Sequence, residues 1–446
     1  MKKLLFAIVL SVGGSAWCAL PQVSDVVLRQ VSKRSVRVSY GIDGEAIVTM
    51  RLLTNGVPVA AERLWNVTGD VNRKVAAGSH EIVWNPQESI PSAVLENAQA
   101  ELTVWDVEVP PTWCGVDLRE GSAATSYPVS YYATEADVPF GPANDCWKEE
   151  RLLLRKVGPT DGAGFPMGAV AGETGECYHR PDVEMGMTVW LTKPVWIGIY
   201  EVTQGQWLKV MGGTNPTLAA HQADPRGTGG VRRPVDNVTL VNIRGNADWP
   251  TDKSVATESF AGRLRQKTGL AFDLPTEAQW EYAARAGQDI AIIPYPFDYF
   301  NEPRAFKDHN GVDHPKLWGL TNQWADLPPA RYDGNRSTLG FDGTADVGTY
   351  VANAWGFYDM VGNVWEHCLD HYIANRQALS SQIDPEGPTA AEAGTTDRLI
   401  RGGSFCEPIL TTKQAACRTA ARYPLAHGGG VNKSGNVGFR IAMTAE

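Results

Sequence analysis

The sequence lacks several features that would place it in a common functional class. It has only 7 cysteines in 446 residues, too few for a disulfide-dense scaffold. It has no excess of positive charge, since its net charge is -10, and this argues against a nucleic-acid partner. A phosphate-binding loop, a Cys-x-x-Cys redox motif, a nucleophile-base-acid spacing and a repeat of fixed period are also missing.

The apolar run near the N-terminus is too short to cross a bilayer. Two lysines at positions 2 and 3 precede this run over residues 4–12, and small residues follow over 13–16. These are the three zones of a secretory signal. We therefore expect residues 1–19 to be a signal peptide, cleaved near residues 16–19, and the mature protein to be periplasmic or secreted, with no membrane span.

Six cysteines remain after such a cleavage, because Cys18 leaves with the signal. An even number in an exported chain permits disulfides without requiring them. The six are Cys114, Cys146, Cys177, Cys368, Cys406 and Cys417.

What the sequence does contain indicates two domains. With 43% hydrophobic and 20% charged residues it is an ordinary globular mixture. Residues 20–108 alternate apolar and polar side chains, as in Val36–Tyr40, and Asn55-Gly56 is typical of a type I′ hairpin turn. We expect an all-β sandwich there, immunoglobulin- or fibronectin-like, with about seven strands. Residues 109–147 are rich in Pro, Ser, Gly and Thr, and they are interpreted as a linker with a short strand near Tyr127–Tyr132.

Residues 148–446 have few long periodic segments, but three helices are predicted. Thr203-Gln204-Gly205-Gln206 is a capping box, and Gly212 supplies a left-handed stop for the helix that follows. Thr276-Glu277-Ala278-Gln279 repeats the capping box. A third helix is expected over roughly residues 258–267, ending at Gly269.

Five segments of this second domain, rich in Gly and Trp, stand out. They are IGIYEVTQGQW (197–207), LPTEAQWEYAARAG (274–287), NAWGFYDMVGNVWEH (353–367), RLIRGGSF (398–405) and GNVGFRIA (435–442). Together they resemble the sulfatase-modifying-factor family, which has the fold of the formylglycine-generating enzyme. The resemblance covers roughly residues 150–446. It implies an irregular α+β fold, related to C-type-lectin-like folds.

The resemblance implies a calcium site at Asp359, Met360, Gly362 and Val364, through one side-chain oxygen and three backbone carbonyls. Calcium takes hard oxygen ligands in flexible geometry, and a glycine lets the backbone curl so that carbonyls converge. The alternative is a tight turn that holds no metal. A second family calcium site needs an aspartate two residues before Phe341, where this sequence has Leu339, although Asp342 is nearby.

The family's catalytic centre binds copper(I) through two cysteines separated by four residues, after a segment that resembles residues 401–404. The resemblance implies that Ser404 and Trp365 line the oxygen site and that Cys406 and Cys417 bind copper. Soft thiolates suit a soft monovalent metal. This sequence departs from the pattern, because ten residues separate Cys406 from Cys417. The pair either converges on copper, forms a structural disulfide, or lies apart as buried side chains.

His367 and His371 give a rival metal hypothesis. On a helix they would lie on one face and share zinc, whereas on a strand they would span about 13 Å. The resemblance places them on a strand, which favours packing or substrate contact.

Three functional hypotheses follow. The protein is an exported copper oxidase that converts a cysteine of a sulfatase to formylglycine, a catalytically inert module that binds a protein or glycan, or a structural element of a cell-surface assembly. In the second, the binding surface would be the loops 407–416 and 427–436.

Overall fold

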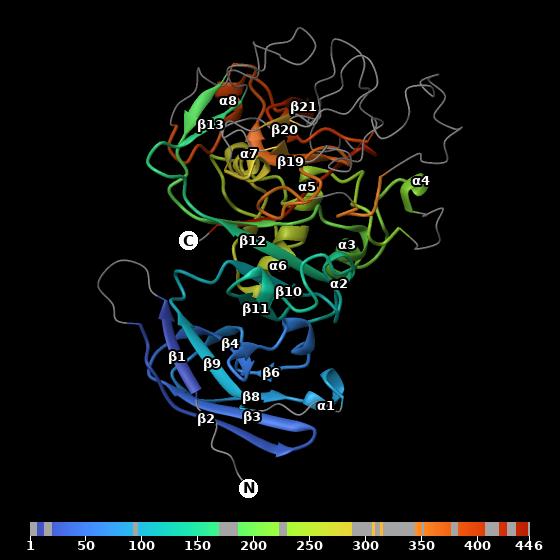
Figure 1. Ribbon diagram of the computed structural model, residues 1–446. Helices are drawn as coiled ribbons and strands as arrows, with labels where there is room; N and C mark the ends of the chain where they lie inside the picture. Colours follow the sequence, from blue (N-terminus) through green and yellow to red (C-terminus); the bar gives the residue numbers. More distant parts are fainter. Residues whose placement is uncertain are drawn as a thin grey trace. The chain divides into compact units, whose positions relative to one another are not determined.

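The computed structural model describes twelve stretches of the chain: residues 7–12, 20–91, 97–168, 186–222, 230–287, 306–307, 313–314, 344–349, 352–375, 382–405, 419–425 and 434–444. The chain divides into two compact units (Figure 1). Unit 1 comprises residues 1–116 and 128–147, and unit 2 comprises residues 117–127 and 148–446.

Unit 1 is built from strands with short helical turns. One sheet has the order β2-β3-β8-β6, and the other has the order β1-β9-β4-β5, with β7 also paired to β4. The elements are β1 (Ala7–Val12), β2 (Val23–Ser32), β3 (Ser35–Ile42), β4 (Ala46–Thr54), β5 (Val57–Pro58), η1 (Ala61–Arg63), β6 (Thr68–Gly69), β7 (Arg73–Val75), β8 (Gly78–Trp84), α1 (Pro86–Ser89), β9 (Gln99–Trp105), β10 (Trp113–Asp117), β11 (Val129–Tyr132), η2 (Glu135–Asp137) and α2 (Cys146–Glu149).

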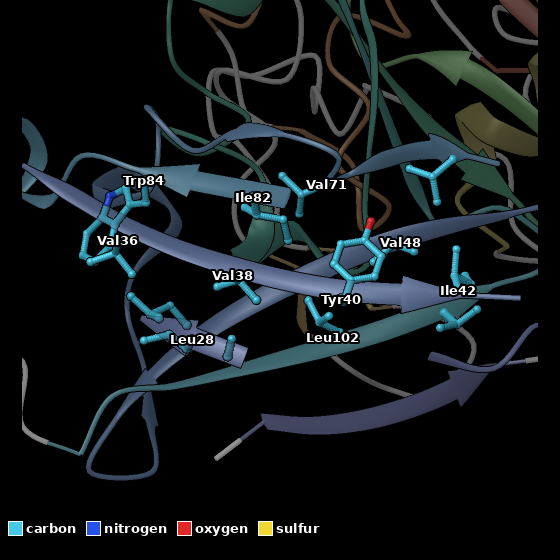
Figure 2. Close-up of a cluster of buried hydrophobic side chains, with 14 of the residues drawn as sticks. Leu28, Val36, Val38, Tyr40, Ile42, Val48, Val71, Ile82, Trp84 and Leu102 are labelled. Atoms are coloured by element: carbon cyan, nitrogen blue, oxygen red, sulfur yellow. The ribbon is translucent and has the colours of Figure 1, made fainter. Parts of the chain in front are cut away.

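The two sheets share one hydrophobic core (Figure 2). Val38 and Tyr40 of β3 contribute to it from one sheet, and Val48 and Leu102 contribute from the other. Buried and more exposed positions alternate along β3 and β9, as a strand with one face on a core requires. The structure therefore has two sheets packed around one core, while their immunoglobulin- or fibronectin-like character stays a prediction.

The predicted hairpin is confirmed. Asn55 and Gly56 connect β4 to β5, and Thr54 pairs with Val57. Their φ angles of 49° and 77° are both positive, as a type I′ turn requires.

The expected signal segment contains a strand in this structure. Residues 7–12 form β1, which pairs in parallel with β9. The cleavage of residues 1–19 therefore stays a prediction, and it would remove β1 and leave β9 at the edge of its sheet.

Residues 109–147 are more structured than a linker. β10 and β11 form an antiparallel hairpin, in which Trp113 pairs with Tyr132. The Tyr131 amide donates to the Asn72 carbonyl with N···O 2.6 Å, and Arg51 binds Asp137 at 2.6 Å, so residues 128–147 are held to the sheets of unit 1. The composition of residues 109–147 did not indicate this hairpin, because prolines and glycines lie close to both short strands.

Unit 2 combines small sheets with short helices. Its elements are β12 (Arg151–Val157), β13 (Phe165–Met167), β14 (Met187–Val189), β15 (Val195–Gly198), α3 (Gln204–Met211), α4 (Ala219–Gln222), α5 (Leu240–Ile243), α6 (Phe260–Thr268), β16 (Phe272–Asp273), α7 (Glu277–Arg285), β17 (Phe306–Lys307), β18 (Asp313–His314), β19 (Trp365–His371), α8 (Ala390–Ala393), β20 (Arg398–Arg401), β21 (Tyr423–Leu425), β22 (Val437–Gly438) and β23 (Ala442–Thr444).

Two sheets of unit 2 organise the motif-bearing segments. In one, β12, β15, β23 and β16 are antiparallel neighbours. In the other, β19 lies between β20, antiparallel to it, and β22, parallel to it, and β21 pairs with β20. Helix α7 packs against β19 and β20. The second sheet thus joins segments that are far apart in the sequence.

The three predicted helices are confirmed as α3, α6 and α7. Thr203 and Thr276 each accept a hydrogen bond from the N3 amide in a complete capping box. Gly212 ends α3, and Gly269 ends α6 in a left-handed conformation. No helix among the described stretches is both long and apolar enough to span a membrane.

Candidate functional site

Two of the residues assigned to the oxygen site, Trp365 and Ser404, lie on either side of Asn436. The Trp365 amide donates to the Asn436 carbonyl with N···O 2.8 Å. The Asn436 side-chain amide donates to the Ser404 hydroxyl with N···O 3.1 Å. The parallel pairing of Trp365 with Val437 sets this arrangement, because it places Asn436 directly beside the start of β19. We call Trp365, Ser404 and Asn436 the Asn436 cluster.

The Asn436 cluster is held in a closely packed environment. Trp365 and Ser404 are both buried. The Trp365 ring packs on Tyr423 with 4.9 Å between ring centres, and Ile400 and Val437 complete its apolar surroundings. These contacts fix the orientation of the indole.

The chain beyond Ser404 leads toward the first predicted copper ligand. The Phe405 amide donates to the Asn363 carbonyl with N···O 2.9 Å, so the position of the backbone just before Cys406 is fixed. Cys406 and Cys417 themselves lie outside the described residues. Of the cysteines within them, Cys114 and Cys368 are buried free thiols.

The predicted calcium segment forms a left-handed turn. Asp359, Gly362 and Asn363 have φ angles of 54°, 89° and 57°. Asp359 Oδ2 accepts the Gly348 amide at 2.6 Å, whereas Asp359 Oδ1 is buried and has no hydrogen-bond partner among the described residues. Burial raises the pKa of this carboxyl to about 6. A buried carboxylate oxygen without a donor fits a cation ligand.

Asp359 shares its buried surroundings with the carboxyls of Glu201 and Glu366 and with the guanidinium of Arg440. Glu201 accepts the Val364 amide at 3.0 Å and the Asn363 side-chain amide at 2.6 Å. Burial, and then the charges of Asp359 and Glu366, raise the pKa of Glu201 well above its usual value. Together these carboxylates favour a cation near Asp359. The second calcium site, at Leu339, Phe341 and Asp342, lies outside the described residues.

The arginines of two motifs anchor the fold. Arg440 donates to both oxygens of Glu366, with N···O 2.6 Å for each bond, and Trp280 donates to the same carboxylate at 2.7 Å. Arg401 binds Glu281, and its guanidinium lies 5.1 Å from the centre of the Trp280 ring. All five side chains of this network are essentially inaccessible to solvent. Its charges therefore compensate one another inside the protein.

One glycine of the RGG segment allows this packing. Gly402 has a φ of 93°, and a Cβ there would lie 3.2 Å from the Trp280 ring and 3.3 Å from the Met360 carbonyl. Its carbonyl accepts the Gly362 amide at 2.8 Å. A residue without a side chain is thus needed where β20 approaches the calcium segment.

A histidine-aspartate pair that no sequence pattern predicted lies near the Asn436 cluster. His221 Nδ1 and Asp236 Oδ2 are 2.5 Å apart, and the Asp236 side chain is completely buried. Burial raises the pKa of the Asp236 carboxyl, while its bonds to His221 and to the Leu218 amide oppose the rise. His221 lies in the four-residue helix α4, and Asp236 lies fifteen positions later in an irregular segment, so no helical or strand spacing indicated the pair.

The zinc hypothesis for His367 and His371 finds no support in the structure. Both lie on strand β19, as the resemblance implied, and are buried. His371 Nε2 lies 2.7 Å from Asp248. Within the described part of the chain there is no group of three or more His, Cys, Asp or Glu side chains that could hold a metal.

Comparison with known families agrees with this arrangement. Residues 161–445, more than half of the chain, match the model of the sulfatase-modifying factor enzyme 1-like domain. The chain belongs to this family. Elements from three other motif-bearing segments, α7, β20 and β22, contact β19 although they are distant from it in sequence.

Curated relatives include active and inactive members. The formylglycine-generating enzyme of Mus musculus is 25% identical over 366 residues, which cover 74% of this chain and 85% of that protein. The enzyme of Thermomonospora curvata is 37% identical over 151 residues, or 33% of this chain and 43% of that protein. The inactive Cα-formylglycine-generating enzyme 2 of Bos taurus is 29% identical over 174 residues, or 39% of this chain and 44% of that protein. This chain therefore spans less than half of the second and third of these relatives.

Proposed function

We propose that the protein is an exported oxidase that converts a cysteine of a sulfatase, or of another exported protein, to formylglycine. The convergence of Trp365 and Ser404 on Asn436 carries this proposal. It keeps both residues assigned to the oxygen site together, and Ser404 lies two positions before Cys406 in the chain. The resemblance to formylglycine-generating enzymes supports the substrate class.

In this proposal Cys406 and Cys417 bind copper(I), which supplies the activation of dioxygen when bound. The residues of the chain have separate tasks. Ser404, anchored by Asn436, presents a hydroxyl at the oxygen site, and Trp365 forms an apolar wall that excludes water from it. A thiol substrate would be held where these side chains meet the segment that follows Phe405.

Calcium has a structural role in the proposal, with Asp359, Met360, Gly362 and Val364 as its ligands. Three observations on the described residues support it: the donor-free Oδ1 of Asp359, the left-handed turn, and the neighbouring carboxyls. Bound calcium would fix the segment that leads into β19 and thereby Trp365.

The experiment has two measurements on one sample. Differential alkylation and mass spectrometry give the redox state of Cys406 and Cys417, and incubation of copper-loaded protein with a sulfatase-type cysteine peptide tests for a new aldehyde by hydrazide capture. We expect two free thiols and aldehyde formation. C406S should abolish conversion, whereas C146S, which replaces a cysteine of unit 1, is the matched control and should keep it.

An alternative function is favoured by the spacing of the two cysteines, with ten intervening residues in place of four. A disulfide between Cys406 and Cys417 would rule out the oxidase. It would leave an inert protein- or glycan-binding module, or a structural element of a cell-surface assembly. If the protein converts no cysteine peptide, its retention on immobilised sulfatase or glycan would distinguish the binding module from the structural element.

A further inference from the structure

His221 lies against two of the three chain segments that carry the Asn436 cluster, those of Ser404 and Asn436. Its ring meets the Phe405 ring edge to face, with 5.4 Å between the ring centres and an interplanar angle of 89°. A Cβ placed on Gly435 would lie 3.5 Å from His221 Cε1. Phe405 directly follows Ser404, and Gly435 directly precedes Asn436. The imidazole therefore lies against the backbone that holds the cluster.

The position of His221 is fixed by a dense set of hydrogen bonds. Asp236 holds Nδ1 at 2.5 Å with one oxygen and accepts the Leu218 amide at 3.0 Å with the other. The Asp236 amide donates to the Thr217 hydroxyl at 3.2 Å. The Gln204 side chain donates to the His221 carbonyl at 3.0 Å. These contacts tie α4 to the segment before α5.

The anchored Nδ1 determines which ring nitrogen can react. Because the Asp236 carboxylate is an acceptor, Nδ1 carries the proton in neutral His221, and Nε2 carries the lone pair. Nε2 has no hydrogen-bond partner among the described residues. It is also not one of the solvent-inaccessible side-chain atoms that lack a partner, so it has contact with solvent. The His221 side chain keeps 9% of its surface exposed.

Two other histidine-aspartate pairs in the chain lack this combination. His80 Nδ1 lies 2.9 Å from Asp70, but its Nε2 is 2.8 Å from the Ala76 carbonyl, so both nitrogens are engaged. His371 binds Asp248 through Nε2, and its Nδ1 is buried without a partner. Of these three histidines, His221 is the one whose Nδ1 is held by an aspartate while its Nε2 remains accessible.

We propose that His221 is the base that accepts the proton of the substrate thiol, and that Asp236 is its positioning residue. This inference rests on the proposed function. The S–H bond breaks, the proton forms an N–H bond at Nε2, and the electron pair stays on sulfur as a thiolate. The resulting imidazolium faces the Asp236 carboxylate, which stabilises it. The thiolate is the more nucleophilic and the more metal-binding form of the substrate.

The first test uses substitutions that separate anchoring from proton transfer. H221N keeps an amide near the position of Nδ1, and so keeps a donor for Asp236, but it has no acceptor at the position of Nε2. We expect an unchanged melting temperature and a loss of peptide conversion of about 100-fold or more. D236N should also lower conversion, because the imidazolium loses its counter-charge. H80N removes the comparable pair in unit 1, and it should leave conversion unchanged.

The second test needs no substrate. Diethyl pyrocarbonate acylates unprotonated, accessible imidazole nitrogens, and peptide mass spectrometry locates the product. We expect His221 to be acylated faster than His80 and His371.

The two tests distinguish failure of the base from failure of the oxidase. Conversion by H221N within about twofold of the unsubstituted protein would overturn the base while leaving the oxidase intact. If the unsubstituted protein converts no cysteine peptide, the oxidase fails and acylation decides for His221. If His221 were then acylated no faster than His371, the claim that its Nε2 is accessible would be refuted. If it were acylated faster, His221 would be a proton acceptor for a ligand other than a cysteine peptide.

Discussion

Removal of Arg440 tests how far the fold depends on buried charge. Arg440 is completely buried, donates to both oxygens of Glu366 at 2.6 Å, and also donates to the carbonyls of Gly198 and Tyr358 at 2.9 and 3.0 Å. In R440M the buried Glu366 carboxylate loses its counter-ion, beside the carboxyls of Glu201 and Asp359.

The expected cost follows from the loss of one partner in a buried ion pair, which destabilises proteins by about 3–5 kcal/mol. A domain of this size loses about 2–4 °C of melting temperature per kcal/mol, so the transition of unit 2 should fall by roughly 6–20 °C. Differential scanning calorimetry is the appropriate assay, because two units can unfold in separate transitions.

Two controls isolate the charge effect. Arg37 pairs with Glu81 at 3.0 Å, but both side chains are about half exposed, so R37M should cost only about 0–1 kcal/mol. Adding E366Q to R440M removes the unpaired charge and should recover part of the loss. If R440M shifted the transition no more than R37M does, the buried pair would not stabilise the fold as argued. If E366Q recovered nothing, lost packing and not lost charge compensation would explain the effect.

Three further predictions follow from individual side chains. Millimolar calcium should raise the melting temperature of the unsubstituted protein but not of D359N, with magnesium as the comparison; a ligand at 100 times its Kd stabilises by about 2.7 kcal/mol. Burial, and next the charge of Glu277, raise the pKa of Asp370 to about 7. The folded state therefore keeps a proton that the unfolded chain releases near pH 4, so stability should fall as the pH rises from about 4 to about 7, and melting curves of D370N should show a smaller slope. Burial raises the pKa of the Cys114 thiol to about 12 and that of the Cys368 thiol well above its usual value. Iodoacetamide at pH 8 should therefore leave both thiols unmodified until the protein is denatured. Peptide mass spectrometry measures this modification.

Features with local causes were predictable from the sequence. The capping boxes at Thr203 and Thr276 involve residues three positions apart, and the turn at Asn55-Gly56 depends on two adjacent residues. Their hydrogen bonds form within the segment that carries the pattern. The irregular domain was predicted in a different way, through a resemblance carried by five segments.

Features that depend on distant partners were not predictable. Asn436 lay within a quoted motif, but its bond to Ser404 spans 32 positions, and only the pairing of β22 with β19 creates it. The motif was the one signal that could have indicated Asn436. His221 and Asp236 had no such signal, because neither lies in a motif-bearing segment and their spacing follows no period.

The motif residues also explain why resemblance predicted the fold better than the chemistry. Glu366, Trp280 and Arg440 occupy three different motifs, and the structure uses all three in one buried network. Loss of any one removes a partner from a buried polar group, so these residues stabilise the fold whether or not the protein reacts with a substrate. An inert protein with this fold needs the same network as an active one. The side chains that separate the two cases must therefore be those that the fold does not require, which directs experiments to the thiols of Cys406 and Cys417 and to the accessible nitrogen of His221.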